Sequence, residues 1–323
     1  MSTVAPPRQG SLAPPGQRSK KAVDDQRAER RRAWRRRLPL LPALTYLILT
    51  TQIPFLTAII ISFTNWHALY PDRGGFAGFD NYVEVFSNPT LRSSVTVTVI
   101  LTVTVVLVSL ILGLAIALLL NREFFGRGAV RTMMITPFLI VPIAAALLWK
   151  HAILNPTYGL LNGTITWIWS LFGSTNPPQV AWVTEMPLIA IEASLIWQWT
   201  PFMMLILLAG LQSLPSDAIE AAKLDGAGPV AIFRYITLPH LRRYIELSVV
   251  LGSVYIVQNF DHVFTMTAGA LGTANLPYAV YQTFFQQQNY GLAAALGVVV
   301  VAGTLIFATF ALRLVSSLQQ EKP

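Results

Sequence analysis

Long apolar segments alternate with short polar ones along the 323 residues of this chain. A helix that spans a bilayer needs about 20 mostly apolar residues, and six segments of the chain reach that length. They cover residues 39–63, 94–120, 129–149, 187–212, 245–265 and 291–314. The strands of a membrane barrel would instead alternate apolar and polar residues over about 10 positions, whereas these runs are continuous. The pattern therefore predicts an all-α, polytopic membrane protein with six transmembrane helices.

The composition supports the same class of protein. Hydrophobic residues make up 54% of the chain and charged residues only 12%, against about 25% charged residues in ordinary soluble proteins. Of the 23 Lys and Arg residues, 20 fall on the side of the spans that holds both termini, and the opposite side has only Arg73, Arg92 and Lys150. Because basic loops remain in the cytoplasm, this bias predicts that both termini are cytoplasmic.

Polar tails flank the predicted six-helix domain of residues 38–315. Residues 1–37 carry 11 of the basic residues and four prolines, a composition typical of a disordered segment. Residues 316–323 are expected to form a second, short cytoplasmic tail. Because the basic tail directly precedes an apolar span, we expect it to set the topology or to contact anionic lipid headgroups rather than to bind nucleic acid.

A further periodic stretch lies between the third and fourth spans. In residues 159–173 the apolar side chains fall mostly on one helical face. This spacing predicts an amphipathic helix, which either lies on the outer membrane surface or packs on its own bundle.

One polar loop, residues 213–243, contains helix-start and helix-end signals that a simple linker would not need. Asp217 and Glu220 have the spacing of a capping box, which predicts a short helix that ends near Gly226 in a left-handed turn. Pro229 is expected to open a second helix and Pro239 to close it. The loop is therefore expected to project as a helix–turn–helix whose tip of small residues lets another protein surface approach closely.

Six residues at this tip carry a family resemblance: Glu220, Ala221, Ala222, Asp225, Gly226 and Ala227. Together with Phe233, Ile236, Leu238 and Pro239 downstream, they resemble the EAA motif of ATP-binding-cassette (ABC) importer permeases. The resemblance implies the fold of a type I importer permease, in which this loop docks into a cleft of a separate ATPase subunit. A helix–turn–helix linker without a partner is the alternative.

Three other segments resemble the carbohydrate-uptake permeases of the maltose and glycerol-phosphate type, namely residues 76–82, 197–215 and 260–269. This resemblance implies a permease of the bacterial inner membrane with a second permease subunit, two ATP-binding subunits and an extracytoplasmic solute-binding protein as partners. Two departures stand out. Residues 267–271 read Thr-Ala-Gly-Ala-Leu where the family usually has Thr-Gly-Gly-Gly-Pro, and Glu192 is unusual in the fourth span. The substrate is therefore not simply inherited from better-known relatives.

The chain lacks the residues for an energy source or chemistry of its own. It contains no Gly-Lys pair and hence no P-loop for ATP, it has no cysteine, and its four histidines are scattered singly. We expect no catalytic activity, no metal and no cofactor in this chain. As the resemblance implies, ATP and Mg²⁺ would be bound by the partner ATPase subunits.

Polar and aromatic residues of the fourth and fifth spans are candidates for the wall of a substrate path: Glu192, Trp197, Gln198, Trp199, Tyr255, Gln258, Asn259 and Asp261. Such groups are costly inside a membrane unless they face a partner or a wet cavity. A sugar or polyol needs donors and acceptors that replace water, next to an aromatic face. The alternative for each residue is hydrogen bonding between helices, or at Asp261 a span end that reaches water. No basic cluster lines these spans, which favours a neutral substrate.

The sequence thus predicts the permease subunit of an ATP-driven, binding-protein-dependent carbohydrate importer that works by alternating access. An ion-coupled secondary transporter of a small polar solute is the alternative. It would require paired repeats with broken helices, and the sequence contains no convincing repeat. A membrane-embedded enzyme would need a catalytic constellation, and none is visible.

Overall fold

The computed structural model describes residues 38–173 and 176–317, which are helical apart from loops and two isolated β-bridges. The all-α fold class is therefore confirmed for the described residues. The chain divides into two units, residues 1–57 and 58–323. The tail predicted at residues 1–37 lies outside the described residues, as do residues 318–323 of the tail predicted at the other end.

Among the described residues, four helices are long and apolar enough to cross a membrane, or up to six if each of two bent pairs is one span. The four are Leu41–Ser62, α5 (Pro89–Leu120), α10 (Pro187–Gln212) and the segment Tyr290–Phe310 of α16 (Tyr290–Ser317). The first consists of α2 (Leu41–Leu47), a π-helical segment η2 (Ile48–Gln52) and α3 (Ile53–Ser62), and it is preceded by a 3₁₀ turn η1 (Leu38–Leu40).

The third apolar segment, predicted at 129–149, is not one straight helix. It consists of α6 (Arg127–Leu139), followed by α7 (Pro142–Leu147) and the π-helical segment η4 (Leu148–Ile153), at an angle of 96°. The break follows from Pro142, which restricts the preceding residue to an extended conformation; Val141 has ψ 133°. The third span therefore has a sharp corner that hydrophobicity alone does not reveal.

The fifth segment also differs from the prediction. A helix runs without interruption from Pro229 to Val257 as α12 (Pro229–Ile232), the π-helical η5 (Phe233–Thr237) and α13 (Leu238–Val257). After a break at 258–260, α14 (Asp261–Thr267) continues at 47°. The prediction that Pro239 closes the loop helix is wrong. The wider π segment, in which the Leu238 N–H donates to the carbonyl five residues back, makes room for the proline ring.

Shorter elements connect these helices. They are η3 (Pro71–Arg73), α4 (Asp80–Ser87), α8 (Leu160–Leu171), α9 (Trp182–Glu185), α11 (Ser216–Leu224), α15 (Leu276–Tyr281) and the π-helical η6 (Gln282–Gln286). In the 76–82 element, the Asn81 side-chain amide donates to the carbonyls of Ser62 and Thr64 at 2.8 and 3.0 Å. This element therefore binds the end of the first spanning helix.

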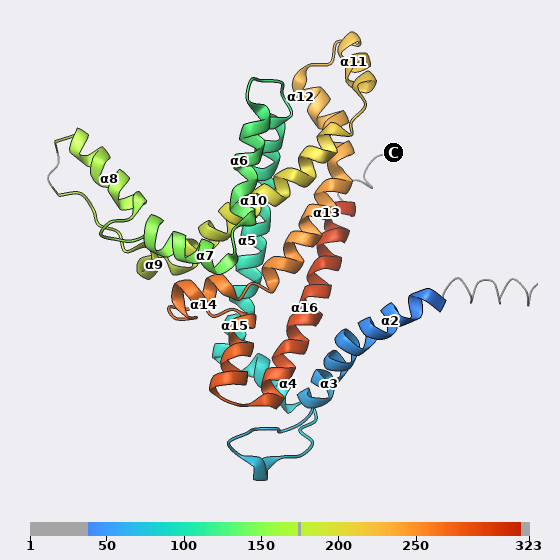
Figure 1. Ribbon diagram of the computed structural model, residues 1–323, viewed down its shortest axis with the longest axis vertical. Coiled ribbons are helices and arrows are strands. Elements are labelled where there is room, and N and C mark those ends of the chain that lie inside the picture. The colour runs from blue at the N-terminus through green and yellow to red at the C-terminus, as the bar shows by residue number, and fades with distance from the viewer. Residues whose placement is uncertain (1–37, 174–175, 318–323) are drawn as a thin grey trace, which may run out of the picture. The chain divides into compact units, whose positions relative to one another are not determined.

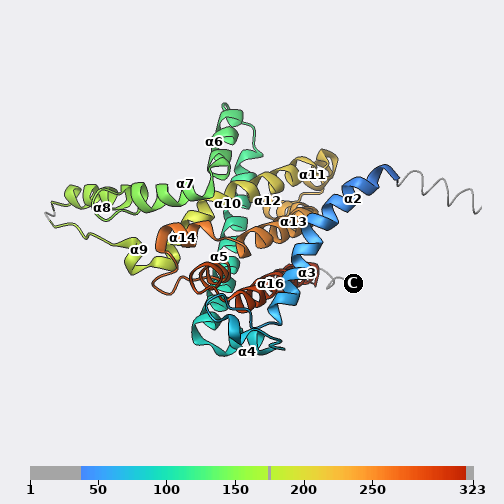
Figure 2. The same ribbon diagram turned by 60° about the horizontal axis from the view of Figure 1, so that its bottom comes forward.

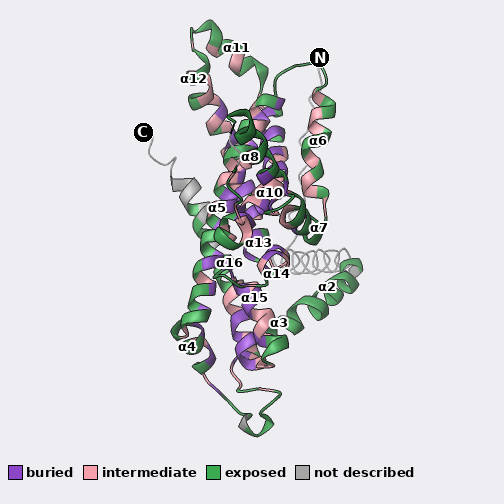
Figure 3. Cartoon of the chain, turned by 90° about the vertical axis from the view of Figure 1, so that its left-hand side faces the viewer, coloured by how far each residue is buried: buried purple, intermediate pink, exposed green. Residues whose placement is uncertain are grey.

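The core of residues 58–323 lies where α10 packs along α5 and where α13 packs against both (Figures 1 and 2). Buried residues concentrate on these helices (Figure 3). They include Leu101 of α5 and Ile191 and Met203 of α10. Gly113 lets the backbones approach closely, because a Cβ there would lie 2.9 Å from Met203 Cβ. A small residue at a crossing is typical of helix packing in membranes.

The amphipathic helix expected at 159–173 is present as α8. Its apolar side chains Leu160, Trp167 and Leu171 are exposed, so the chain's own bundle does not cover them. The helix is attached at its start, where buried Asn162 accepts a hydrogen bond from the Trp182 indole at 2.9 Å. Of the two expected arrangements, the exposed apolar face favours a helix that lies on a membrane surface.

Candidate functional site

The polar loop of residues 213–243 contains α11, and this helix ends in a well-defined turn. Gly226 has φ +84°, so the predicted left-handed turn is confirmed. The Ala227 N–H donates to Ala222 O at 2.9 Å and the Gly226 N–H to Lys223 O at 3.1 Å. This pair of bonds is a Schellman motif, which satisfies the last carbonyls of the helix. The turn at the tip of the loop is therefore fixed by backbone geometry.

The start of α11 differs from the prediction. The N-cap residue is Pro215, which makes no side-chain hydrogen bond, so Asp217 and Glu220 do not form a capping box. The helix begins two residues earlier than the capping box requires, and Asp217 falls within its first turn. There its carboxylate still interacts favourably with the positive end of the helix dipole.

The six loop residues singled out in the sequence lie together at the tip of the loop. Glu220, Ala221, Asp225 and Gly226 are exposed and Ala222 and Ala227 are half-buried. The structure adds two apolar side chains that the motif does not mention, because Leu224 is 89% and Val230 79% exposed. These two side chains place apolar surface beside the exposed carboxylates of Glu220 and Asp225 at the tip. In Figure 1, α11 and α12 project from the ends of α10 and α13.

The base of this loop is bound to the two helices that carry it. Ser213 Oγ lies 2.8 Å from Tyr244 Oη and 3.0 Å from His240 Nε2, and it donates to Gly210 O at 2.8 Å. Gly210 permits the contact, because a Cβ there would lie 2.6 Å from the Tyr244 ring. The end of α10 and the start of α13 are therefore held together beneath the loop, so displacement of the loop must move both helices.

The candidate path residues on α10 do not share one environment. Gln198 is buried, and its Nε2 donates to Ile140 O at 2.8 Å, the carbonyl at the corner between α6 and α7. Trp197 lies on another side, where it contacts Trp149 and lines a pocket of about 620 Å³ between α5, α6 and α10. Glu192 is buried beside Thr104 of α5, and its Oε1 has no partner among the described residues. Gln198 Nε2 thus joins α10 to the corner of the third span, while its Oε1 has no partner among the described residues.

The aromatic residues form a more continuous surface. Tyr255 of α13 is exposed and its ring lies 5.3 Å from that of Trp199 on α10. Trp199 in turn contacts Phe138 of α6 and Phe202, with ring centroids 5.5 and 5.6 Å apart. Phe138 and Phe202 also stack on each other at 5.3 Å, so the four rings form one aromatic cluster that connects α6, α10 and α13.

Three polar candidates lie at the break between α13 and α14. Gln258 is exposed and ends α13, and Asp261 is half-buried and begins α14. Asn259 lies between them; its Nδ2 is 3.3 Å from His262 Nδ1 and its Oδ1 has no partner among the described residues. The break therefore presents three polar side chains next to the last turn of the helix that carries Tyr255.

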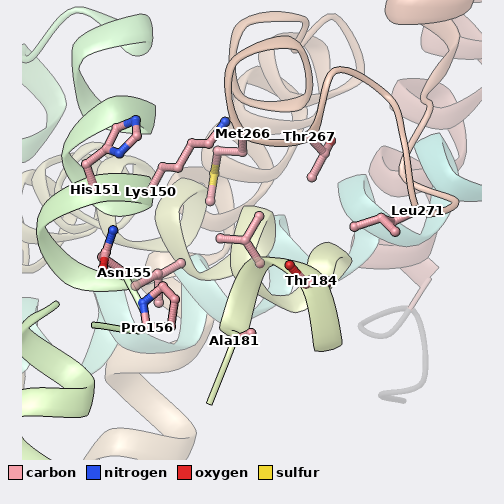
Figure 4. A pocket seen from close by; sticks show the side chains of 11 residues that line it. Lys150, His151, Asn155, Pro156, Ala181, Thr184, Met266, Thr267 and Leu271 are labelled. Atoms are coloured by element: carbon pink, nitrogen blue, oxygen red, sulfur yellow. The ribbon is translucent and has the colours of Figure 1, made fainter. Parts of the chain in front are cut away.

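A separate pocket of about 350 Å³, lined by both apolar and polar side chains, lies between η4, α9 and α14 (Figure 4). Lys150 reaches across it and donates to Thr265 O at 3.0 Å. None of the candidate path residues lines this pocket. Sequence reasoning missed it because it is formed by short segments from three distant parts of the chain, and Lys150 entered that reasoning only as an outer charge.

The geometry defines a class of protein: a helical membrane protein with a long polar loop that is exposed at its tip and fastened at its base. Residues 109–320 match the family model for the binding-protein-dependent transport system inner membrane component, and the chain belongs to that family. The resemblance to ABC importer permeases is thereby confirmed. The alternative of an ion-coupled secondary transporter finds no support. The structure does contain broken helices, but these do not distinguish an ion-coupled transporter from an ABC importer permease, whereas membership of this family does.

Relatives match over most of the chain. A probable ABC transporter permease protein, y4oQ of Sinorhizobium fredii, is 33% identical over 82% of this chain and 84% of its own length. The trehalose/maltose transport system permease protein MalF of Thermococcus litoralis is 31% identical over 84% and 90%. The trehalose transport system permease protein SugA of Mycobacterium tuberculosis is 28% identical over 89% of both chains.

The fold also has solved counterparts. A chain of the crystal structure of a bacterial ABC transporter involved in the import of the acidic polysaccharide alginate superposes with a TM-score of 0.75. The sequences are 22% identical, and the match covers 91% of this chain and 99% of that one. At this identity the similarity concerns the fold, which is that of an ABC importer permease.

Proposed function

We propose that this chain is the transmembrane permease subunit of an ATP-driven importer for a neutral sugar or polyol, supplied by a solute-binding protein. Relatives named for transport of trehalose and maltose match over most of its length. The aromatic cluster that includes Tyr255, next to Gln258 and Asn259, offers the aromatic face and the amide groups that a hydroxylated ligand needs.

The proposed assembly contains a second permease subunit as a heterodimer partner, two ATP-binding subunits and an extracytoplasmic solute-binding protein. The alginate transporter solved in complex with an alginate pentasaccharide-bound periplasmic protein supports the last of these partners. The chain itself is not an enzyme and binds no cofactor, because ATP and Mg²⁺ are held by the ATP-binding subunits. The chain lies in the bacterial inner membrane, and the loop of residues 213–243 and both termini face the cytoplasm.

One observation carries the proposal: the tip of the loop at α11 is exposed, while the base of the loop is bound to α10 and α13. We assign the tip as the surface that docks on an ATP-binding subunit. Glu220 and Asp225 supply negative charge for basic groups, and Leu224 and Val230 supply the apolar contact that is buried on docking. Motion of the ATP-binding subunits would then shift α10 and α13 and alternate the access of the path between the two sides.

Among the candidate path residues, the roles differ. Tyr255, Gln258, Asn259 and Asp261 are assigned to ligand contact, together with Trp199. Gln198 is assigned to holding the corner of the third span, because its Nε2 is already engaged with Ile140 O. Trp197 and Glu192 lie away from the aromatic cluster and are not assigned to ligand contact.

The proposal is tested by reconstituting the chain with its co-purifying subunits in vesicles and measuring ATP-dependent uptake of trehalose, maltose and glycerol. Replacing Leu224 with alanine should remove a central interface side chain and reduce uptake and retention of the ATPase, since a docking anchor of this kind contributes about 1–2 kcal/mol. Glu123→Ala, in another exposed loop, serves as the matched control and should behave as the wild type.

Two results would contradict this proposal. One is uptake that persists without any ATPase chain and follows an ion gradient. The other is an unchanged ATPase association in Leu224→Ala and Glu220→Ala together.

A further inference from the structure

An unpaired charge lies at the end of α6 that is nearest the coupling side of the molecule. Nε and Nη2 of Arg131 are buried and have no hydrogen-bond partner among the described residues. The guanidinium carries a full positive charge. Arg131 as a whole is half-buried, and its third nitrogen, Nη1, is not among the buried atoms. An anion can therefore reach the guanidinium only at Nη1, and the described residues supply no such group.

A groove begins next to this charge. The pocket of about 620 Å³ that contains Trp197 is lined on α6 by Met133, Met134 and Pro137, which follow Arg131 directly. Its walls are apolar apart from two indoles and Thr200, whose hydroxyl donates to the carbonyl four residues back. Met133 is 73% exposed, so the groove opens towards whatever surrounds the spans. A groove of this composition favours a hydrocarbon chain over a sugar.

The spacing between the charge and the groove matches that within a phospholipid. Along α6, Met133 to Pro137 lie roughly 3–9 Å beyond Arg131 at 1.5 Å per residue. A bilayer of about 40–45 Å with a hydrocarbon core of about 30 Å leaves about 5–8 Å for each headgroup layer. A phosphate at Arg131 would therefore place its acyl chain at the level of the groove.

The loop between α5 and α6 has the character of a segment at a membrane interface. Arg127, one turn before Arg131 and on the same face of α6, forms no ion pair with a described residue. Phe124 and Phe125 are exposed, the latter fully. Basic side chains with aromatic residues at the end of a span are typical of contact with anionic headgroups.

We propose that Arg131 and the groove between α5, α6 and α10 form a binding site for one anionic phospholipid of the leaflet on the coupling-loop side. Nη1 of Arg131 binds the phosphate, Arg127 adds to the positive field, and one acyl chain lies in the groove against Met134 and Trp197. This site is independent of the transported solute.

Native mass spectrometry of the full chain with its co-purifying subunits tests the proposal. The complex is titrated with phosphatidylglycerol and with phosphatidylcholine of the same acyl chains. We expect one phosphatidylglycerol to be retained more strongly than phosphatidylcholine. Arg131→Gln should weaken phosphatidylglycerol binding by about five- to tenfold, as expected for loss of one charge-assisted contact, and abolish the preference. Arg131→Lys should retain part of it.

Two further variants separate the charge from the groove. Arg92→Gln removes an exposed arginine from the opposite end of the spans and should bind phosphatidylglycerol as the wild type does. Ala193→Trp fills the groove and should weaken both lipids alike. Equal retention of the two lipids by the wild type, or unchanged binding in Arg131→Gln, would overturn the proposal. So would a second permease subunit found seated in the groove.

Thermal unfolding in lipid-free detergent tests whether Arg131→Gln weakens lipid binding merely by destabilising the fold. Because the guanidinium has no partner within the described chain, Arg131→Gln should unfold at a temperature no lower than the wild type under these conditions. A marked decrease would mean that Arg131 has a structural partner in the protein, and this result also overturns the assignment.

Discussion

Replacing Gly226 with alanine tests whether the turn at the tip of the loop matters for coupling. Gly226 has φ +84°, and no atom lies within 4 Å of where a Cβ would stand. The substitution therefore meets no steric obstacle, and its cost comes from the left-handed backbone alone. That cost is about 1–2 kcal/mol for a residue with a Cβ, which corresponds to roughly a 5–30-fold shift in the population of the native turn.

The expected result is a reduction of the same order in ATP-dependent uptake and in ATPase activity stimulated by the loaded binding protein. The rest of the fold should be unaffected, so the melting temperature of the complex should fall by no more than a few degrees. Gly226→Asn should recover much of the activity, because asparagine tolerates the left-handed region better than alanine does.

Gly228→Ala is the matched control. Gly228 lies two residues further along the same loop, also has no atom within 4 Å of an added Cβ, and has an ordinary φ of −74°. It should therefore behave as the wild type. If Gly226→Ala and Gly228→Ala transport equally well, the geometry of the Schellman turn does not contribute to coupling and the reasoning is refuted.

Three other substitutions have defined outcomes. Gly210→Val should lower the melting temperature, because the new side chain overlaps the Tyr244 ring at a distance of 2.6 Å and overpacking typically costs about 1–3 kcal/mol; an unchanged melting temperature would contradict the close contact. Gln198→Leu should lower stability by about 0.5–1.5 kcal/mol and leave KM for uptake unchanged, since it removes a bond to a backbone carbonyl; a raised KM alone would instead make Gln198 a ligand contact. Tyr255→Ala should raise KM with little effect on stability, because the ring is exposed and contacts mainly Trp199; unchanged KM would remove it from the path.

Hydrophobicity and charge predicted the fold class, because a bilayer requires long apolar helices and the lengths of such runs are visible in one sequence. The fourth span was predicted at 187–212, and α10 covers the same residues. The corner before Pro142 and the continuous helix through Pro239 were not predicted. Both depend on how the chain accommodates a proline, by an extended residue in one case and a π segment in the other.

For the candidate site, the sequence was more informative about features set by neighbouring residues than about contacts between distant segments. The left-handed turn at Gly226 depends only on neighbouring residues, and the sequence predicted it correctly. The capping box failed because Pro215 occupies the N-cap position. The separation of Trp197 from Tyr255, and the engagement of Gln198 with Ile140, depend on which helices become neighbours, and this information is absent from a single span.

The uninterrupted helix from Pro229 to Val257 has a mechanical consequence. At 1.5 Å per residue it is a rod on the order of 40 Å long, with the docking tip beside one end and Tyr255 in the last turn of the other. A rod transmits torsion as well as thrust, so a small rotation imposed from outside the membrane swings the tyrosine ring by the same angle. The helix breaks only beyond Val257, where the polar side chains of residues 258–261 lie, so the chain bends there and not between the docking tip and Tyr255.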